Sequence, residues 1–266
     1  SGFEILEYCQ SMAERFGFYD RCLFHTTVEQ TSWSEESGRW SVRTDRGDVM
    51  KARFVLLANG ILTTPKLARI AGMEEFKGES FHTSRWDYEV DLAGKRVGII
   101  GTGATSVQAV PELAKVVKEL FVFQRTPSSI DVRDQRETSA REIEQWRNEP
   151  GWARARRRRF AKISAGRTAL QGNDDYLSGK VADFKERKSY TKPLSHEEML
   201  QKQLDSNFRI MEQLRARVDA IVEDSVTAEA LKPYYPYGCK RPAFHDEYLP
   251  SFNLPHVHLV DTAPRG

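Results

Sequence analysis

The stretch "KRVGIIGTGATSVQAVPELAKVVKELFVFQ", from Lys95 to Gln124, decides the fold. It has the pattern of a short apolar strand, a glycine-rich turn, a helix and a second apolar strand. Two parallel strands need such a helical crossover between them, so the order indicates one β-α unit that leads into a parallel sheet. The sequence therefore predicts an α/β fold around this segment.

The turn inside this stretch has the spacing GxGxxS, formed by Gly101, Gly103 and Ser106. The two glycines permit a tight turn and let backbone N–H groups at the helix start approach a pyrophosphate. Ser106 is small enough for close packing of the helix on the strand. A strand before the turn and a helix after it favour a Rossmann-like dinucleotide site over a simple tight turn. The expected binding residues are Gly101, Thr102, Gly103, Ala104, Thr105 and Ser106.

The end of the second strand indicates which dinucleotide is bound. A site for NAD has an acidic residue there, which accepts a hydrogen bond from the ribose 2′-hydroxyl. This chain has Gln124, Arg125 and Thr126 instead. A guanidinium can bind a 2′-phosphate through forked hydrogen bonds, and a neighbouring hydroxyl adds a donor. We therefore expect these three residues to bind NADP(H); the alternative is a solvent-exposed arginine after a strand.

Composition places the chain among ordinary globular proteins. Its 266 residues are 39% hydrophobic and 29% charged, with 40 Lys and Arg against 38 Asp and Glu. This predicts about two domains, and it predicts neither a nucleic-acid partner nor a membrane partner for the chain as a whole. No apolar run reaches the roughly 18 residues of a membrane span, and no signal peptide is visible. The three cysteines form no CxxC pair, which favours free thiols in a reducing, cytoplasmic compartment.

The first sixty residues predict a helix followed by three strands. Apolar residues at helical spacing indicate a helix in "FEILEYCQSMAERF", residues 3–16. The strand candidates are "LFHTTVEQ", "RWSVRT" and "KARFVLLANG", joined by the polar turns "SEESG" and "DRGD". The third candidate is apolar from Phe54 to Ala58, so we expect it to be buried.

Residues of about 133–232 are charged, poor in glycine and predicted to be helical. They indicate a helical insertion into the nucleotide-binding domain. Ser195 and Glu198 have the spacing of a capping box at a helix start. One apolar stripe is expected to follow it, formed by Leu200, Leu204, Met211, Leu214, Val218 and Ile221. The last strand candidate is "NLPHVHLVD", in which His256 and His258 alternate without a third ligand, so no metal site is expected.

The basic run "RARRRRFAK", Arg154–Lys162, lies in this insertion. Runs of this kind can bind nucleic acid, which leaves a non-catalytic, polyanion-binding module as one alternative function. The surrounding glutamates and aspartates favour a solvated helix face instead.

A second motif precedes the glycine turn in "EEFKGESFHTSRWD", Glu74–Asp87, called the fingerprint segment below. It resembles the fingerprint FxGxxxHxxxW(P/D) of type I Baeyer–Villiger monooxygenases, which are class B flavin-dependent monooxygenases. The matching residues are Phe76, Gly78, His82, Trp86 and Asp87. Related enzymes that oxygenate nitrogen or sulfur usually have Tyr or Phe in place of Trp86, so they are the alternative reading.

The resemblance implies an enzyme that uses FAD, NADPH and O2 to convert a ketone into an ester or lactone through a peroxyflavin. In "YPYGCKRP" it implies that Arg241 is the catalytic arginine beside the flavin and that Lys240 helps to hold the NADP phosphate. A fixed guanidinium favours a peroxide anion and the charged intermediate that follows it. For the fingerprint residues the expectation is a hinge or conformational role between two domains.

The resemblance also suggests a domain division. A second GxGxxG, which would bind FAD, does not occur before Gly101. We therefore expect residues 1–62 to be a partial FAD-binding segment and residues 63–266 to be the NADP-binding domain with its insertion. On this reading the chain is a fragment of a longer enzyme that lacks the FAD fingerprint and the C-terminal region. No oligomeric state and no particular ketone follow from these features.

Overall fold

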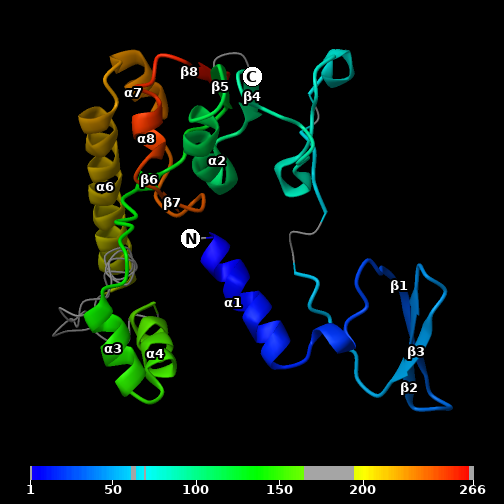
Figure 1. Ribbon diagram of the computed structural model, residues 1–266. Helices are drawn as coiled ribbons and strands as arrows, with labels where there is room; N and C mark the ends of the chain where they lie inside the picture. Colours follow the sequence, from blue (N-terminus) through cyan, green and yellow to red (C-terminus); the bar gives the residue numbers. More distant parts are fainter. Residues whose placement is uncertain (1, 61–63, 69, 165–194, 264–266) are drawn as a thin grey trace. The chain divides into compact units, whose positions relative to one another are not determined.

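The computed structural model describes residues 2–60, 64–68, 70–164 and 195–263 (Figure 1). The chain divides into two compact units, Ser1–Met73 and Glu74–Gly266. The expected domain boundary at residues 62 and 63 lies outside the described residues, so the assignment of the two parts to FAD and NADP domains stays a prediction. Along the described chain, no helix combines the length and the apolar character that a membrane crossing would need.

The first unit consists of a helix and a three-stranded antiparallel sheet. Its elements are α1 (Gly2–Arg15), the 3-10 turn η1 (Tyr19–Arg21), β1 (Val28–Ser34), β2 (Arg39–Thr44) and β3 (Val49–Ala52). The strand order is β1-β2-β3. Trp33 lies opposite Trp40 in the register, with ring centroids 5.6 Å apart. Such cross-strand aromatic pairs stabilise a sheet by about 0.2–1 kcal/mol.

Two of the three strand predictions in this unit are wrong in position. The helix, the second strand and both turns are confirmed. The first strand starts at Val28 because His25 has φ +50°, a left-handed conformation that an extended strand does not contain. The third strand ends at Ala52. Phe54 and Leu56 are 79% and 87% exposed, because no described strand pairs with their backbone and an apolar run is buried only where it has a neighbour.

The second unit contains the parallel sheet predicted from the glycine-rich stretch. Its strands are β4 (Arg96–Ile100), β5 (Glu119–Gln124) and β8 (Val257–Asp261), in the order β4-β5-β8. Helix α2 (Ala104–Ala114) is the crossover from β4 to β5. A second, two-stranded parallel sheet joins β6 (Ile130–Asp131) to β7 (Ala243–Phe244). The α/β, Rossmann-like fold class is therefore confirmed.

The core of this unit lies between the three-stranded sheet and its helices. Val110 of α2, Leu120 and Val122 of β5, and Leu249 of α8 (Tyr248–Ser251) are all 0% exposed. Packing is close enough that a Cβ on Gly98 would lie 3.1 Å from the Phe123 ring. The burial of alternate β5 residues follows from the period of two in a strand that faces a core.

The described part of the insertion is helical, as predicted. It contains α3 (Ala140–Asn148), α4 (Trp152–Ser164), α6 (His196–Ile221) and α7 (Ser225–Leu231); residues 165–194 lie outside the described residues. The capping box of Ser195 and Glu198 is confirmed. The predicted apolar stripe of α6 is confirmed only in its second half. Met211, Leu214 and Val218 are buried. Leu200 and Leu204, in its first half, are 50% and 44% exposed.

The burial of Leu120 predicts a large effect on stability. Replacing Leu120 by alanine should lower the free energy of unfolding by about 2–5 kcal/mol, because it leaves a cavity between β5 and the helices. Leu200→Ala is the matched control, since Leu200 is 50% exposed and its truncation should change stability by about 0.5 kcal/mol or less. Urea denaturation followed by circular dichroism measures both. Equal losses for the two variants would contradict the position of the core.

Candidate functional site

The glycine turn at the end of β4 has the geometry of an anion site. Gly101 has φ +100°, which L side chains rarely adopt, whereas Gly103 caps α2 at φ −71° and ψ 177°. The first-turn N–H groups of a helix have no intrahelical acceptor, and α2 has no acidic residue in its first turn. A Cβ at either glycine would meet nothing within 4 Å. The turn therefore leaves room and unpaired donors for a pyrophosphate, as a dinucleotide site requires.

Thr102 connects this turn to the loop that follows β5. Its hydroxyl donates to the carbonyl of Thr126 at 2.7 Å, and the Ser128 hydroxyl donates back to the carbonyl of Thr102. Thr102 is buried, at 6% exposed, so its side chain serves to hold the turn to the loop. Sequence reasoning missed Ser128, which has no local signal beyond its place after the strand.

The loop after β5 presents Arg125 to solvent and keeps Gln124 inside. Gln124 is 0% exposed, and its side-chain N–H donates to the Ala230 carbonyl of α7 at 2.7 Å. Gln124 thus holds the strand end, while Arg125 is exposed and has no ion-pair partner in the described ranges. An unpaired guanidinium keeps its five N–H donors for a ligand. Thr126 is half-buried beside it.

Lys240 is linked to the loop after β5 by the side chain of Tyr235, which contacts both. Its Nζ lies 5.0 Å from the centroid of the Tyr235 ring. The hydroxyl of Tyr235 accepts a hydrogen bond from the backbone N–H of Ser129 at 3.1 Å. Ser129 also accepts at its carbonyl from the N–H of Ala243 at 2.9 Å. The segment that carries Lys240 is therefore joined to the loop after β5 both before and after the lysine.

Asp246 fixes the far end of the segment that carries Lys240 and Arg241. Its carboxylate accepts the backbone N–H groups of Arg133, Asp134 and Gln135 at 2.9, 3.3 and 3.2 Å. Burial raises the pKa of Asp246, but the three N–H donors outweigh it, so its pKa lies below the ordinary value. Asp246 is therefore ionised at neutral pH. Arg241 itself is exposed and has no ion-pair partner among the described residues.

Two residues near this segment are held in their neutral forms. Burial is the main cause that lowers the pKa of His245, whose Nδ1 accepts the backbone N–H of Glu247 at 3.1 Å. Burial likewise raises the pKa of the Tyr248 phenol in the core. Neither group adds a charge to the candidate site.

His82 and Trp86 of the fingerprint segment have structural contacts. The Nδ1 atom of His82 accepts the backbone N–H of Ser84 at 3.1 Å, which caps the 3-10 turn η3 (Thr83–Arg85). Trp86 meets Phe81 edge to face at 5.1 Å and packs against the core of the second unit. Their predicted role as a hinge between domains stays a prediction.

The other fingerprint residues shape the local backbone. The Phe76 ring lies over Gly78, where an added Cβ would be 2.6 Å from it. The Asp87 carboxylate accepts the N–H of Glu89 at 3.0 Å. Together with His82 and Trp86, these contacts define a compact segment at the start of the second unit. Another 3-10 turn of the same length, η2 (Met73–Glu75), overlaps the first two residues of the segment.

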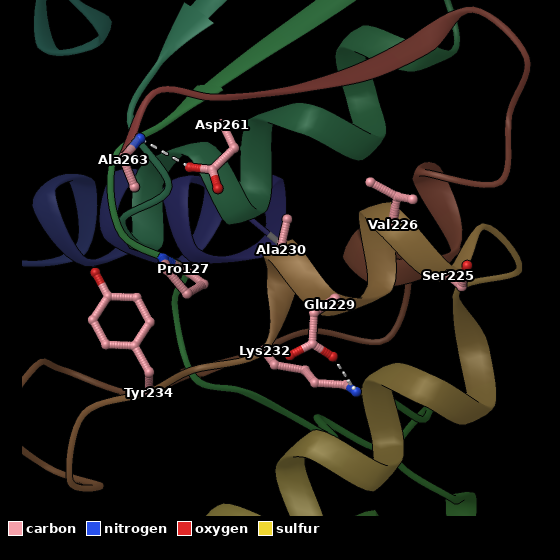
Figure 2. A pocket seen from close by; sticks show the side chains of 9 residues that line it. All are labelled: Pro127, Ser225, Val226, Glu229, Ala230, Lys232, Tyr234, Asp261 and Ala263. Carbon is pink, nitrogen blue, oxygen red and sulfur yellow. Dashed lines mark hydrogen bonds and ion pairs between the residues drawn. The ribbon is translucent and has the colours of Figure 1, made fainter. Parts of the chain in front are cut away.

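A cavity of about 530 Å³ lies beside the carboxyl ends of β5 and β8 (Figure 2). Inside it, Lys232 pairs with Glu229 at 2.8 Å. Two carboxylates in the lining of the cavity, Glu229 and Asp261, disfavour the binding of a phosphate there. None of the site residues predicted from the sequence lines the cavity. The lining residues are Pro127, Ser225, Val226, Glu229, Ala230, Lys232, Tyr234, Asp261 and Ala263. Across the described ranges, His, Cys, Asp and Glu form no cluster that could hold a metal.

The second unit thus brings together most of the residues that sequence reasoning selected. The glycine turn, Arg125 and Thr126 lie at the carboxyl ends of adjacent strands, and Tyr235 links Lys240 to the same loop. The donor set consists of backbone N–H groups and two cations, which fits a dinucleotide with an additional phosphate. Tyr235, Ser129 and Asp246 were missed because their contacts join residues more than a hundred positions apart.

The chain is similar to known flavin-dependent monooxygenases. Residues 2–139 match the family described as FMO-like, flavin-binding monooxygenase-like. A Baeyer–Villiger monooxygenase of Stachybotrys chlorohalonatus is 47% identical over 280 residues, which cover all of this chain and 44% of that protein. The structure of the polycyclic ketone monooxygenase from Thermothelomyces thermophila matches with a TM-score of 0.85 at 40% identity, covering 99% of this chain and 46% of the other.

A further solved structure, OTEMO in complex with FAD and NADP, matches with a TM-score of 0.72 at 31% identity. It covers 99% of this chain and 51% of that chain. The chain therefore spans about half the length of the relatives that it matches.

Replacing Gly101 or Gly103 by alanine should change the stability of the protein by different amounts. Gly101→Ala should lower the free energy of unfolding by about 1–2 kcal/mol, because φ +100° is unfavourable for an L residue. Gly103→Ala is the matched control, since its φ of −71° suits alanine and its surroundings are open. Urea denaturation without ligand measures both. A larger loss for Gly103→Ala than for Gly101→Ala would contradict the turn geometry.

Proposed function

The chain belongs to the flavin-binding monooxygenase-like family, and on this basis we propose that the whole protein is a Baeyer–Villiger monooxygenase. It would use NADPH, FAD and O2 to convert a ketone into an ester or lactone. The observation that carries the proposal is the complete fingerprint, whose Trp86 packs against the core of the unit that contains the proposed NADP site. Relatives with Baeyer–Villiger names at up to 47% identity support it.

In this proposal the second unit binds NADPH. The N–H groups at the start of α2 bind the pyrophosphate, because the helix dipole and the unpaired donors both favour an anion there. Arg125 and Lys240 bind the 2′-phosphate, with Thr126 as an additional donor. Both cations are exposed and lack ion-pair partners in the described part, so a phosphate would not have to displace a carboxylate.

FAD supplies, when bound, the activation of dioxygen on which oxygen insertion depends. The residues of this chain contain one glycine turn of the dinucleotide type, and its charged neighbours fit NADP. This turn is therefore assigned to NADP, and we assign no flavin-binding residue. We retain, as part of the proposal, that residues 1–62 belong to the FAD-binding domain and residues 63–266 to the NADP-binding domain.

Arg241 is proposed as the catalytic residue of this chain. Attack on a ketone carbonyl places negative charge on the substrate oxygen, and a guanidinium held nearby stabilises that charge. A guanidinium offers N–H donors and no acceptor, so the proposed role of Arg241 is to stabilise negative charge. Asp246 and the pairing of β6 with β7 restrict the segment that carries it.

The fingerprint segment is proposed to have a conformational role. His82 and Asp87 accept backbone N–H groups within the segment, and Trp86 is packed against the core, so these side chains are occupied in maintaining its shape. Exchange of the nicotinamide and the substrate beside one flavin requires movement between steps. A segment of fixed shape can transmit such a movement. The protein is further proposed to be cytoplasmic, since its three cysteines are free and exposed.

An N- or S-oxygenating flavin monooxygenase is the alternative, because the description of the matched family does not name the atom that is oxygenated. Product analysis with a cyclic ketone and with a tertiary amine separates the two. Ester or lactone from the ketone supports the Baeyer–Villiger proposal, and N-oxide as the sole product contradicts it.

Arg125→Ala should weaken the binding of NADPH by about 10- to 100-fold, because it removes charge-assisted hydrogen bonds to the 2′-phosphate. Binding of NADH, which lacks that phosphate, should change by less than about twofold. Isothermal titration of the whole protein measures both affinities. Lys118→Ala is the control, since this exposed cation lies just before the opposite, amino end of β5. Equal losses for the two coenzymes would remove Arg125 from the 2′-phosphate site.

Arg241→Ala should lower kcat for ester formation by at least about 100-fold, as expected when a donor to a developing oxyanion is lost. Affinity for NADPH should remain near that of the parent, because Arg241 is not part of the glycine turn. Product formation from a ketone, together with coenzyme titration, measures the two effects. Arg147→Ala, an exposed arginine of α3, is the control. Retained ester formation would exclude Arg241 from the reaction.

A further inference from the structure

Lys240 has an unusual partner for a cation in a candidate phosphate site. Its ammonium lies 5.0 Å from the centroid of the Tyr235 ring, and no described carboxylate pairs with it. A carboxylate partner would neutralise the lysine and compete with a phosphate. The face of an aromatic ring attracts the cation more weakly, and it leaves the N–H donors unused. The Tyr235 ring therefore restrains the position of the ammonium and leaves its N–H donors available for a phosphate.

Tyr235 is itself attached to the loop that follows β5. Its hydroxyl accepts the backbone N–H of Ser129 at 3.1 Å, and the Ser129 hydroxyl lies 3.5 Å away. Ser129 is 1% exposed and lies four residues after Arg125. The tyrosine is half-buried, and its ring also meets the Tyr234 ring edge to face at 6.0 Å. The position of the ring is thus determined by the loop that carries Arg125 and Thr126.

The segment that carries Lys240 is also held on the C-terminal side of the lysine. Three residues after Lys240, the N–H of Ala243 donates to the Ser129 carbonyl at 2.9 Å, and β7 pairs with β6 from that point. Ser129 is therefore bonded to the chain on both sides of Lys240. The side chain of Lys240 is long and flexible, and its contact with Tyr235 restricts the directions that it can take.

We propose that Tyr235 is a positioning residue that restrains Lys240 near the loop after β5, and that it thereby contributes to the preference for NADPH over NADH. The inference rests on the proposed function, because it assumes that the loop after β5 receives the 2′-phosphate. Tyr235 does not contact the coenzyme in this proposal. It acts through Lys240, so its effect should require both the lysine and the phosphate.

A double-mutant cycle in the whole protein tests this, with the affinities for NADP+ and NAD+ measured by isothermal titration. Lys240→Met should weaken NADP+ binding about tenfold or more, because a charged donor to the phosphate is lost. Tyr235→Leu should weaken it by about 2- to 5-fold, as expected for an exposed cation–π contact. NAD+ affinity should change less than about twofold in both. In the Lys240→Met background, Tyr235→Leu should have no further effect on NADP+.

Tyr235→Phe keeps the ring and removes the hydroxyl that bonds to Ser129. It should lose less NADP+ affinity than Tyr235→Leu, and it also covers the case in which the leucine variant does not fold. Three results would overturn the inference: equal losses for NADP+ and NAD+, an undiminished effect of Tyr235→Leu without Lys240, or a larger loss for phenylalanine than for leucine.

The parent protein separates failure of this inference from failure of the proposed function. If the parent binds NADP+ no better than NAD+, or Arg125→Ala leaves its preference unchanged, the 2′-phosphate site itself is wrong. If the parent prefers NADP+ through Arg125 and Tyr235→Leu leaves that preference intact, only the role of Tyr235 is wrong.

Discussion

The parallel ladder between β4 and β5 determines where the candidate site can form. Ile100 lies opposite Phe123 at its last step, and the next N–H, that of Gly101, donates to the Phe123 carbonyl at 2.9 Å. Because both strands end at one level, the glycine turn and the loop with Arg125 leave the sheet side by side. A register slip of one residue would turn the side chains of a strand to the opposite face. The proposed coenzyme site therefore depends on this register.

Lys240 is linked to the loop after β5 through Tyr235, although a long stretch of chain separates them. Tyr235 and Ser129, which hydrogen-bond to each other, are separated by 106 residues. The entropy of closing a loop grows only slowly with its length, so a long helical insertion adds little to that cost. After the insertion the chain must come back to a fixed position beside the loop after β5. The pairing of β6 with β7 fixes that position. Gln124 adds a second connection, from the end of β5 to the Ala230 carbonyl of α7.

Features encoded by neighbouring residues were predictable, and those that depend on distant partners were not. The strand before Gly101, the turn and the capping box at Ser195 each need only a few adjacent residues, and all three are confirmed. The apolar residues 54–58 were expected in a buried strand, but burial depends on a neighbour that local sequence does not specify. The same reason explains why Tyr235 was missed.

The contact of Trp86 with the core has a mechanical consequence. The fingerprint segment starts at the boundary between the two units, and its tryptophan is packed into the second of them. Because Trp86 is packed against that core, the fingerprint segment would move together with the second unit as one piece. The five fingerprint residues would then keep their positions relative to the core of that unit.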